Sequence, residues 1–143
     1  MFRVAVINGA NLNLLGAREP VHYGLKTLED IARDLEREFK EKITFNFFQS
    51  NSEGALIDHV QGLKNIDGIV INPGAFTHTS IALRDALLAR SLPTIEVHLS
   101  NVHAREPFRK HSYFSDICRG TISGLGPQVY RLAIFGLLSI LAE

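Results

Sequence analysis

Residues 93–100, Pro-Thr-Ile-Glu-Val-His-Leu-Ser, contain three side chains that can do chemistry. Isoleucine, valine and leucine alternate there with Glu96, His98 and Ser100, which is typical of a β-strand. Side chains two apart on a strand point to the same face, so we expect these three groups on one face. One interpretation is an edge strand with one wet face. The other is a strand that ends in an active site, with Glu96 orienting His98 as an acid or base.

Amide side chains follow two further runs that the sequence predicts as buried strands. Residues 4–7 are wholly apolar and lead to Asn8, which we assign to turn chemistry, and to Asn11, which can present its amide to a ligand. Residues 68–71 are likewise apolar and lead to Asn72 at a turn. Amides in these positions can hold a developing enolate or a bound water without changing charge.

Arg18 and Tyr23 lie five residues apart in the loop after the first strand. The ordinary pKa of tyrosine, about 10, is too high for a free base at neutral pH, but a nearby arginine stabilises tyrosinate and lowers that pKa. His98 can supply the opposite function, and Arg109 can hold a substrate carboxylate with its planar fork. A base, an acid and an anion clamp suit proton abstraction next to a carbonyl, followed by loss of water.

The elements that must position these residues alternate along the chain. The hydrophobic pattern predicts β-α-β-α-β-α-β-loop-β-α, with strands at 4–7, 43–48, 68–71, 93–100 and 120–122, and helices from 27, at 53–63, after 80 and from 127 to 141. The hydroxyl of Thr27 suits the N-cap of the first helix. Such alternation is typical of an α/β fold, here a single flavodoxin-like domain over residues 1–143. We expect a five-stranded parallel sheet in the order 2-1-3-4-5 with helices on both faces and ligands outside the carboxyl ends of the strands.

Two parts of this pattern bear on the surface of the protein. The last helix is apolar nearly all round, so it is buried deeply or lies in a subunit contact. The segment 101–111 is polar and basic and is interpreted as a long loop with Pro107 as a breaker.

Composition limits the class of protein further. The chain has 143 residues, 45% of them apolar, and a formal net charge of zero, which argues against a general electrostatic grip on nucleic acid or an anionic membrane. Zero net charge does not exclude a local basic pocket that binds a small anion. The single cysteine, Cys118, fits a reducing compartment, and the N-terminus has no signal-peptide layout. The longest apolar tract is too short for a bilayer, so we expect a soluble cytoplasmic protein without membrane contact.

Several other chemistries lack their signatures. No Gly-x-Gly-x-x-Gly follows a strand, and neither a Walker loop nor a Gly-x-Ser-x-Gly elbow is present. His98 and His103 have no partner set at metal spacing, and the five lysines fall on wet faces or loops. His78 precedes a predicted helix that contains Asp85, and the sequence by itself favours a solvated charge for Asp85.

Motifs run in order along nearly the whole chain, and together they resemble those of the type II 3-dehydroquinate dehydratases. They are Asn8-Gly-Ala-Asn-Leu-Asn-Leu-Leu-Gly16, Arg18-Glu-Pro20, Tyr23-Gly24, Ser52-Glu-Gly54, Asn72-Pro-Gly-Ala75, His78-Thr-Ser80, Arg84-Asp85, Glu96-Val-His-Leu-Ser-Asn101, Arg105-Glu-Pro-Phe-Arg109 and Gly120-Thr-Ile-Ser-Gly-Leu-Gly126. One departure is Ala10, where the family usually has proline.

The resemblance implies a lyase that converts 3-dehydroquinate to 3-dehydroshikimate in the shikimate pathway or in quinate breakdown. The elimination would be anti, through an enolate, without metal or organic cofactor. By the family's pattern Tyr23 is the base, Arg18 keeps it ionised, His98 protonates the departing hydroxyl, Glu96 orients His98, and Asn11 holds a water that bridges to the enolate oxygen. The substrate-binding residues would be Asn72, His78, Asp85, Leu99, Ser100 and Arg109, the contacts of Leu99 and Ser100 being through the backbone.

The family forms trimers that assemble into dodecamers, which would let Asp85 serve a neighbour's site. Two interpretations other than a dehydratase stay open. One is a non-catalytic flavodoxin-like module that binds a small carboxylate, because a fold does not imply a function. The other is an FMN-binding electron carrier, which a colourless purified protein would exclude. Tyr23, Arg18 and His98 favour the enzyme, since a binding module needs neither a base nor an acid.

Overall fold

The computed structural model describes residues 1–17 and 25–143, which contain one parallel sheet in the order β2-β1-β3-β4-β5. This is the predicted order. The strands are β1 (Phe2–Asn8), β2 (Ile43–Gln49), β3 (Gly68–Asn72), β4 (Thr94–His98) and β5 (Gly120–Ser123). The helices are α2 (Leu28–Phe39), α3 (Glu53–Gly62), α4 (Ile81–Arg90) and α5 (Gln128–Leu141).

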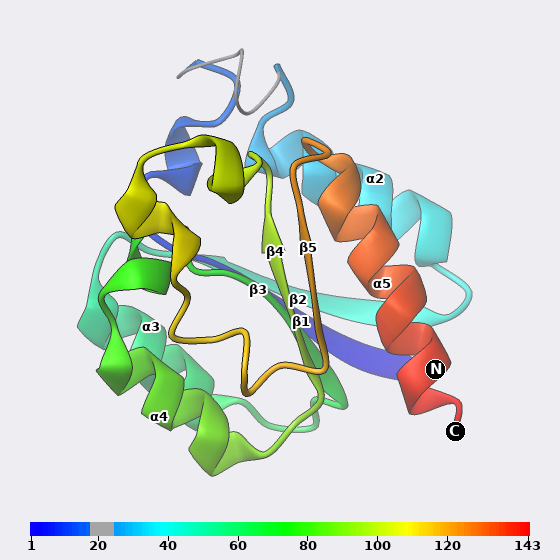
Figure 1. Ribbon diagram of the computed structural model, residues 1–143. Coiled ribbons are helices and arrows are strands. Elements are labelled where there is room, and N and C mark those ends of the chain that lie inside the picture. Colours follow the sequence, from blue (N-terminus) through cyan, green and yellow to red (C-terminus); the bar gives the residue numbers. More distant parts are fainter. Residues whose placement is uncertain (18–24) are drawn as a thin grey trace.

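Helices cover both faces of the sheet, α2 and α5 on one side and α3 and α4 on the other (Figure 1). Alternate residues of β1 supply the two cores: Val4 and Val6 pack with α2 and α5, whereas Ala5 and Ile7 pack with α3 and α4. A strand that is buried on both faces has no wet side, which explains the uninterrupted apolar run in its sequence.

Strand β4 lies between β3 and β5, so the edge-strand interpretation of its polar residues is wrong. Its apolar residues Ile95 and Val97 belong to the core under α2 and α5. On the opposite face the connection from β4 to β5 covers the strand, anchored by Phe114, which has no exposed surface and packs with α3 and α4. The polar residues of β4 therefore lie buried under this connection and have little contact with solvent.

Short 3-10 helices shape the loops at the carboxyl ends of the strands. They are η1 (Leu12–Leu14), η2 (Gly74–His78), η3 (Val102–Ala104) and η4 (Pro107–Lys110). The last two replace the long loop expected after β4, and Pro107 begins η4 instead of breaking structure. Its fixed φ suits the first turn of a helix, where no intrahelical bond to its nitrogen is needed.

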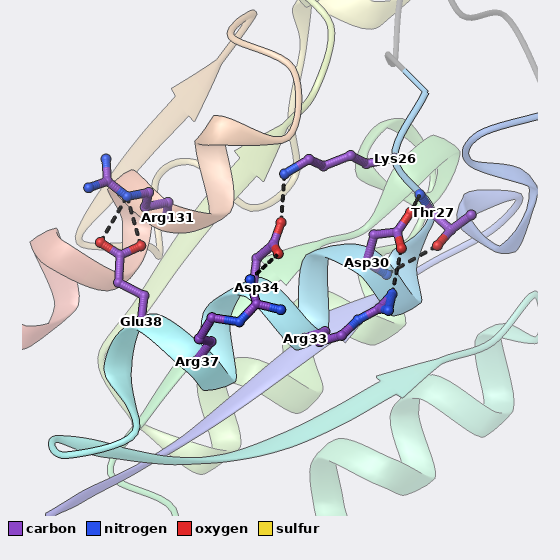
Figure 2. A network of polar contacts seen from close by, with 8 residues as sticks. All are labelled: Lys26, Thr27, Asp30, Arg33, Asp34, Arg37, Glu38 and Arg131. Carbon is purple, nitrogen blue, oxygen red and sulfur yellow. Dashed lines mark hydrogen bonds and ion pairs between the residues drawn. The ribbon is translucent and has the colours of Figure 1, made fainter.

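Helix α2 begins with a capping box and carries an exposed network of charges (Figure 2). Thr27 accepts a hydrogen bond from the Asp30 N–H at 3.1 Å, and Asp30 accepts one from the Thr27 N–H at 3.0 Å, which confirms the predicted N-cap. The ion pair of Arg131 with Glu38, at 2.8 Å, links α5 to the same helix. In the described ranges, no helix is both long enough and apolar enough to cross a lipid bilayer.

Candidate active site

A pocket lies outside the carboxyl ends of β1, β3 and β4, where the doubly wound fold places ligands. Its volume is about 720 Å³, including the part open to solvent. It brings together seven of the predicted site residues: Asn11, Asn72, His78, His98, Leu99, Ser100 and Arg109. These residues lie at or after the carboxyl ends of β1, β3 and β4 or in η4, so the fold brings together residues that are far apart in the sequence.

The remaining predicted site residues do not line this pocket. Glu96 lies behind His98, to which it is hydrogen-bonded. Asp85 is exposed on α4 and is not among the residues that line this pocket. Arg18 and Tyr23, the predicted cation and base, lie outside the described residues.

Glu96 and His98 share one face of β4, as the alternation predicts, and they form a hydrogen bond of 2.5 Å between Nε2 and Oε2. The Glu96 side chain is 1% exposed. Ser112 Oγ donates to Oε2 at 2.9 Å, and Ser115 Oγ donates to Oε1 at 2.6 Å. Burial by itself raises the pKa of Glu96, but the hydrogen bonds from His98, Ser115 and Ser112 outweigh burial and hold the pKa below its ordinary value.

An ionised Glu96 has two consequences for His98. A carboxylate can only accept, so His98 Nε2 carries a hydrogen and the other ring nitrogen, Nδ1, is the one that can exchange a proton with a ligand. The negative charge of Glu96 also balances the positive charge of an imidazolium. The pair therefore has the arrangement of an oriented acid, with His98 at the pocket wall and its carboxylate behind it.

A second histidine, His78, is held in its neutral form. His78 Nδ1 lies 2.7 Å from the carbonyl oxygen of His111, and because a carbonyl only accepts, Nδ1 carries the hydrogen. Desolvation lowers the pKa of His78, even though the bond to His111 acts in the opposite direction. Neutral His78 thus offers Nε2 as an acceptor at the pocket wall.

The wall formed by residues 100–109 is basic. Arg109 Nε donates to Glu106 at 3.0 Å, and Arg105 donates to Ser100 Oγ at 3.3 Å. The pocket lining comprises these two arginines, two histidines and no carboxylate among the described residues. A local excess of positive charge in a chain of zero net charge suits a small anionic ligand.

Another part of the pocket lining is built from two loops in close backbone contact. A Cβ on Gly9 would lie 2.0 Å from the carbonyl oxygen of Pro73, and one on Gly74, at φ +62°, would lie 2.7 Å from that of Ala10. Only glycine fits at both positions. The two loops are also hydrogen-bonded, because the Gly9 N–H donates to the carbonyl oxygen of Asn72 at 2.8 Å. The loops carrying Asn11 and Asn72 therefore form one continuous wall.

Asn8 has a different role from the turn chemistry predicted for it. It is buried at the end of β1, where its Oδ1 accepts a hydrogen bond from the hydroxyl of Tyr130. Tyr130 was not expected near the pocket, because it falls within the apolar pattern of α5. The usable signal is a tyrosine inside an apolar helical pattern, because a buried tyrosine hydroxyl usually has a hydrogen-bond partner.

The sequence prediction also lacked Arg105, Ser112 and Ser115. Arg105 lines the pocket four residues before Arg109, in the same basic segment, so its spacing was a usable signal. The two serines lie 16 and 19 residues after Glu96 in an irregular connection, where no periodicity marks them. Over residues 1–17 and 25–143, no group of three or more histidine, cysteine, aspartate or glutamate side chains is placed to hold a metal ion.

Comparisons with known proteins identify the family of the chain. Residues 2–138 match the model of the family "Dehydroquinase class II". A 3-dehydroquinate dehydratase of Methylococcus capsulatus is 57% identical over 143 residues, covering 98% of this chain and 97% of that protein. A catabolic 3-dehydroquinase of Aspergillus clavatus is 57% identical over 133 residues, covering 92% and 89%.

Solved structures give the same result. The crystal structure of a type II dehydroquinase from Butyrivibrio crossotus is similar with a TM-score of 0.91 and 44% identity, over 99% of this chain and 98% of that one. The family match, the sequence identity and the shared fold extend over almost the full length of the chain. The chain therefore belongs to the class II dehydroquinases, the type II family of 3-dehydroquinate dehydratases.

Proposed function

We propose that this enzyme removes water from 3-dehydroquinate by anti elimination through an enolate, giving 3-dehydroshikimate. The observation that carries the proposal is the Glu96–His98 pair, buried on one side and at the wall of a basic pocket on the other. An acid oriented in this way suits protonation of a departing hydroxyl, and the positive charge around it suits a substrate with a carboxylate.

In the proposed reaction the two protons move at different residues. Tyr23, kept ionised by Arg18, takes the proton next to the ketone, and the electron pair of the broken C–H bond forms the enolate. When the enolate collapses, the carbonyl re-forms, the electron pair of the enolate double bond moves to make the new conjugated double bond, and the C–OH bond breaks. His98 gives the departing hydroxyl a proton, so that it leaves as water. Asn11, at the pocket wall, holds the water that bridges to the enolate oxygen.

The substrate contacts follow the charges of the two walls. Arg109 binds the carboxylate, and Asn72 and neutral His78 bind hydroxyl groups. Leu99 and Ser100 contribute backbone groups where the chain leaves β4. No metal or organic cofactor takes part in this scheme.

Asp85 completes the site from a neighbouring subunit in the proposed assembly, a trimer that forms dodecamers. Two observations support an assembly: Asp85 is exposed on α4, away from its own pocket, and α5 keeps Leu132 and Phe135 exposed at 37% and 45%. We place the enzyme in the cytoplasm, in the shikimate pathway or in quinate breakdown. Neither pathway changes the chemistry required of the pocket.

The activity is tested with Tyr23→Phe, because this change removes the proposed base and keeps the ring. Product formation is followed by the ultraviolet absorbance of the conjugated enone. We expect loss of turnover by at least about 100-fold, the usual contribution of a general base, with binding of a substrate analogue retained. Tyr113→Phe is the matched control, since Tyr113 lies outside the pocket, and it should keep full activity.

Undiminished turnover in Tyr23→Phe would refute the assigned base. Inactivation by borohydride in the presence of substrate would instead indicate a lysine imine. The alternative of a non-catalytic carboxylate-binding module predicts analogue binding without any enone formation by the unmodified chain, so the same assay separates the two functions.

A further inference from the structure

A buried chain of hydrogen bonds connects the first turn of α5 to the pocket. Tyr130 has no exposed surface, and its hydroxyl lies between Asn8 and Asn72, which face each other at the ends of β1 and β3. The hydroxyl bonds to Asn8 Oδ1 and to Asn72 Nδ2, the latter at 3.1 Å. Asn72 Oδ1 accepts the backbone N–H of Gly74, also at 3.1 Å. Because Asn72 lines the pocket, the chain runs from the core to the site.

One fixed donor determines the direction of every bond in this chain. The Gly74 N–H can only donate, so the Asn72 atom that faces it is the oxygen, and Nδ2 faces Tyr130. Nδ2 in turn can only donate, so the tyrosine oxygen accepts from it and the hydroxyl hydrogen goes to Asn8 Oδ1. Burial raises the pKa of Tyr130 far above its ordinary value, so this hydrogen stays in place at neutral pH.

The amide of Asn72 is therefore held in one orientation. Its oxygen and one Nδ2 hydrogen are occupied, and the second Nδ2 hydrogen has no partner in the described part of the chain. Asn72 is 3% exposed, and it contributes to the pocket wall. A terminal amide torsion is soft by itself, so the fixed orientation depends on the partners on either side.

We propose that Tyr130 is a positioning residue for substrate binding, whose hydroxyl fixes the Asn72 amide so that its second N–H hydrogen meets a substrate oxygen. This inference rests on the substrate-binding role proposed above for Asn72. Tyr130 itself does not line the catalytic pocket and acts through its neighbour.

The test is a double-mutant cycle with Tyr130→Phe and Asn72→Ala, measured as kcat/KM for 3-dehydroquinate. Tyr130→Phe keeps the buried ring and removes the hydroxyl. We expect about a tenfold lower kcat/KM, mainly through a higher KM, which is the scale of one misplaced hydrogen bond. In the Asn72→Ala background the same change should cost less than about twofold, because the amide that the hydroxyl orients is gone.

Two outcomes overturn the inference. Unaltered kcat/KM in Tyr130→Phe means that the hydroxyl is not needed, and equal fold losses in both backgrounds mean that it does not act through Asn72. Unaltered kinetics in Asn72→Ala alone would instead refute the role of Asn72, so failure of the proposed function is recognised separately.

Ile134→Val provides the control for packing. Ile134 is fully buried one turn further along α5, outside the pocket lining, and its shortening loosens the same helix. We expect kcat/KM within about twofold of the unmodified enzyme, since this change costs stability and moves no polar group. A loss equal to that of Tyr130→Phe would assign the effect to helix packing and end the proposal.

A second variant covers the case in which Tyr130→Phe does not fold. Asn8→Ala removes the acceptor of the Tyr130 hydroxyl and tests the chain from its other end. A loss of about threefold in kcat/KM that disappears in the Asn72→Ala background supports the inference, and a loss that persists there contradicts it.

Discussion

Two sets of ionisable side chains in this protein have similar chemistry and opposite surroundings. On α2, α5 and the segment just before α2, the pairs Lys26–Asp34 and Glu38–Arg131 lie at the surface, with side chains 34–53% exposed (Figure 2). On β4 the Glu96 side chain is 1% exposed. Exposed pairs are screened by water and salt, whereas a buried carboxylate needs a full set of partners.

The difference shows where a charge can control chemistry. Both oxygens of Glu96 accept hydrogen bonds, and its buried charge acts on His98 through a direct hydrogen bond. The surface network joins two helices but faces solvent, so its charges set no protonation state in the pocket. Substitutions of the same kind at the two places should therefore have different effects.

The largest expected effect is that of Glu96→Gln on turnover. Glutamine keeps the size of the side chain but removes the charge that balances an imidazolium at His98. We expect kcat to fall by about 100-fold, at the lower end of what general acid catalysis contributes. Glu38→Gln is the matched control in the exposed network, and its kcat should equal that of the unmodified enzyme. Similar losses in both variants would contradict the distinction between the two sets.

An intermediate effect is expected on stability in acid. The pKa of Glu96 lies below its ordinary value of 4.5, so ionised Glu96 stabilises the folded state above pH 4.5, and this contribution is lost as the pH falls through the lower, folded-state pKa. The difference in free energy of unfolding between the unmodified chain and Glu96→Gln should narrow below pH 4.5. Denaturant titrations at fixed protein concentration at pH 7, 5 and 3.5 measure it, and a constant difference would exclude the linkage.

The smallest effect is expected for Lys26→Met, which removes one exposed ion pair with Asp34. The melting temperature should decrease slightly at low salt and stay unchanged at about 0.5 M NaCl, because screening already removes the attraction there. Lys64→Met is a suitable control, since Lys64 forms no ion pair with the described residues. A large decrease that persists in high salt would show that the surface network behaves like the buried pair.

Local sequence rules predicted most of the fold. The alternation at 93–100 anticipated that Glu96 and His98 share a face, and the hydroxyl of Thr27 marked the start of α2. The order of strands followed from the alternation of apolar runs with helical stretches. Each of these features depends on residues within a few positions of one another, which is where periodicity and capping carry information.

Contacts between distant residues could not be predicted in this way. The bond from Tyr130 to Asn8 joins residues 122 positions apart, and Ser115 reaches Glu96 from an irregular connection. Proline breaks a helix in its interior but suits the first turn, and the sequence around Pro107 does not show where η4 begins. Its interpretation as a breaker was therefore wrong. Asp85 shows a further limit, since its proposed partner lies on another copy of the chain.

The glycine contacts between the loops after β1 and β3 affect how the enzyme can adapt to different ligands. Gly9 and Gly74 lie in close contact with backbone carbonyls of the neighbouring loop. We therefore expect the two loops to move together, so that Asn11 and Asn72 do not shift independently. Adjustment is easier at Arg105 and Arg109, whose long side chains also line the pocket and can change rotamer without moving the backbone. An inhibitor series should therefore tolerate variation at the end facing the arginines and reject it at the end facing the amides.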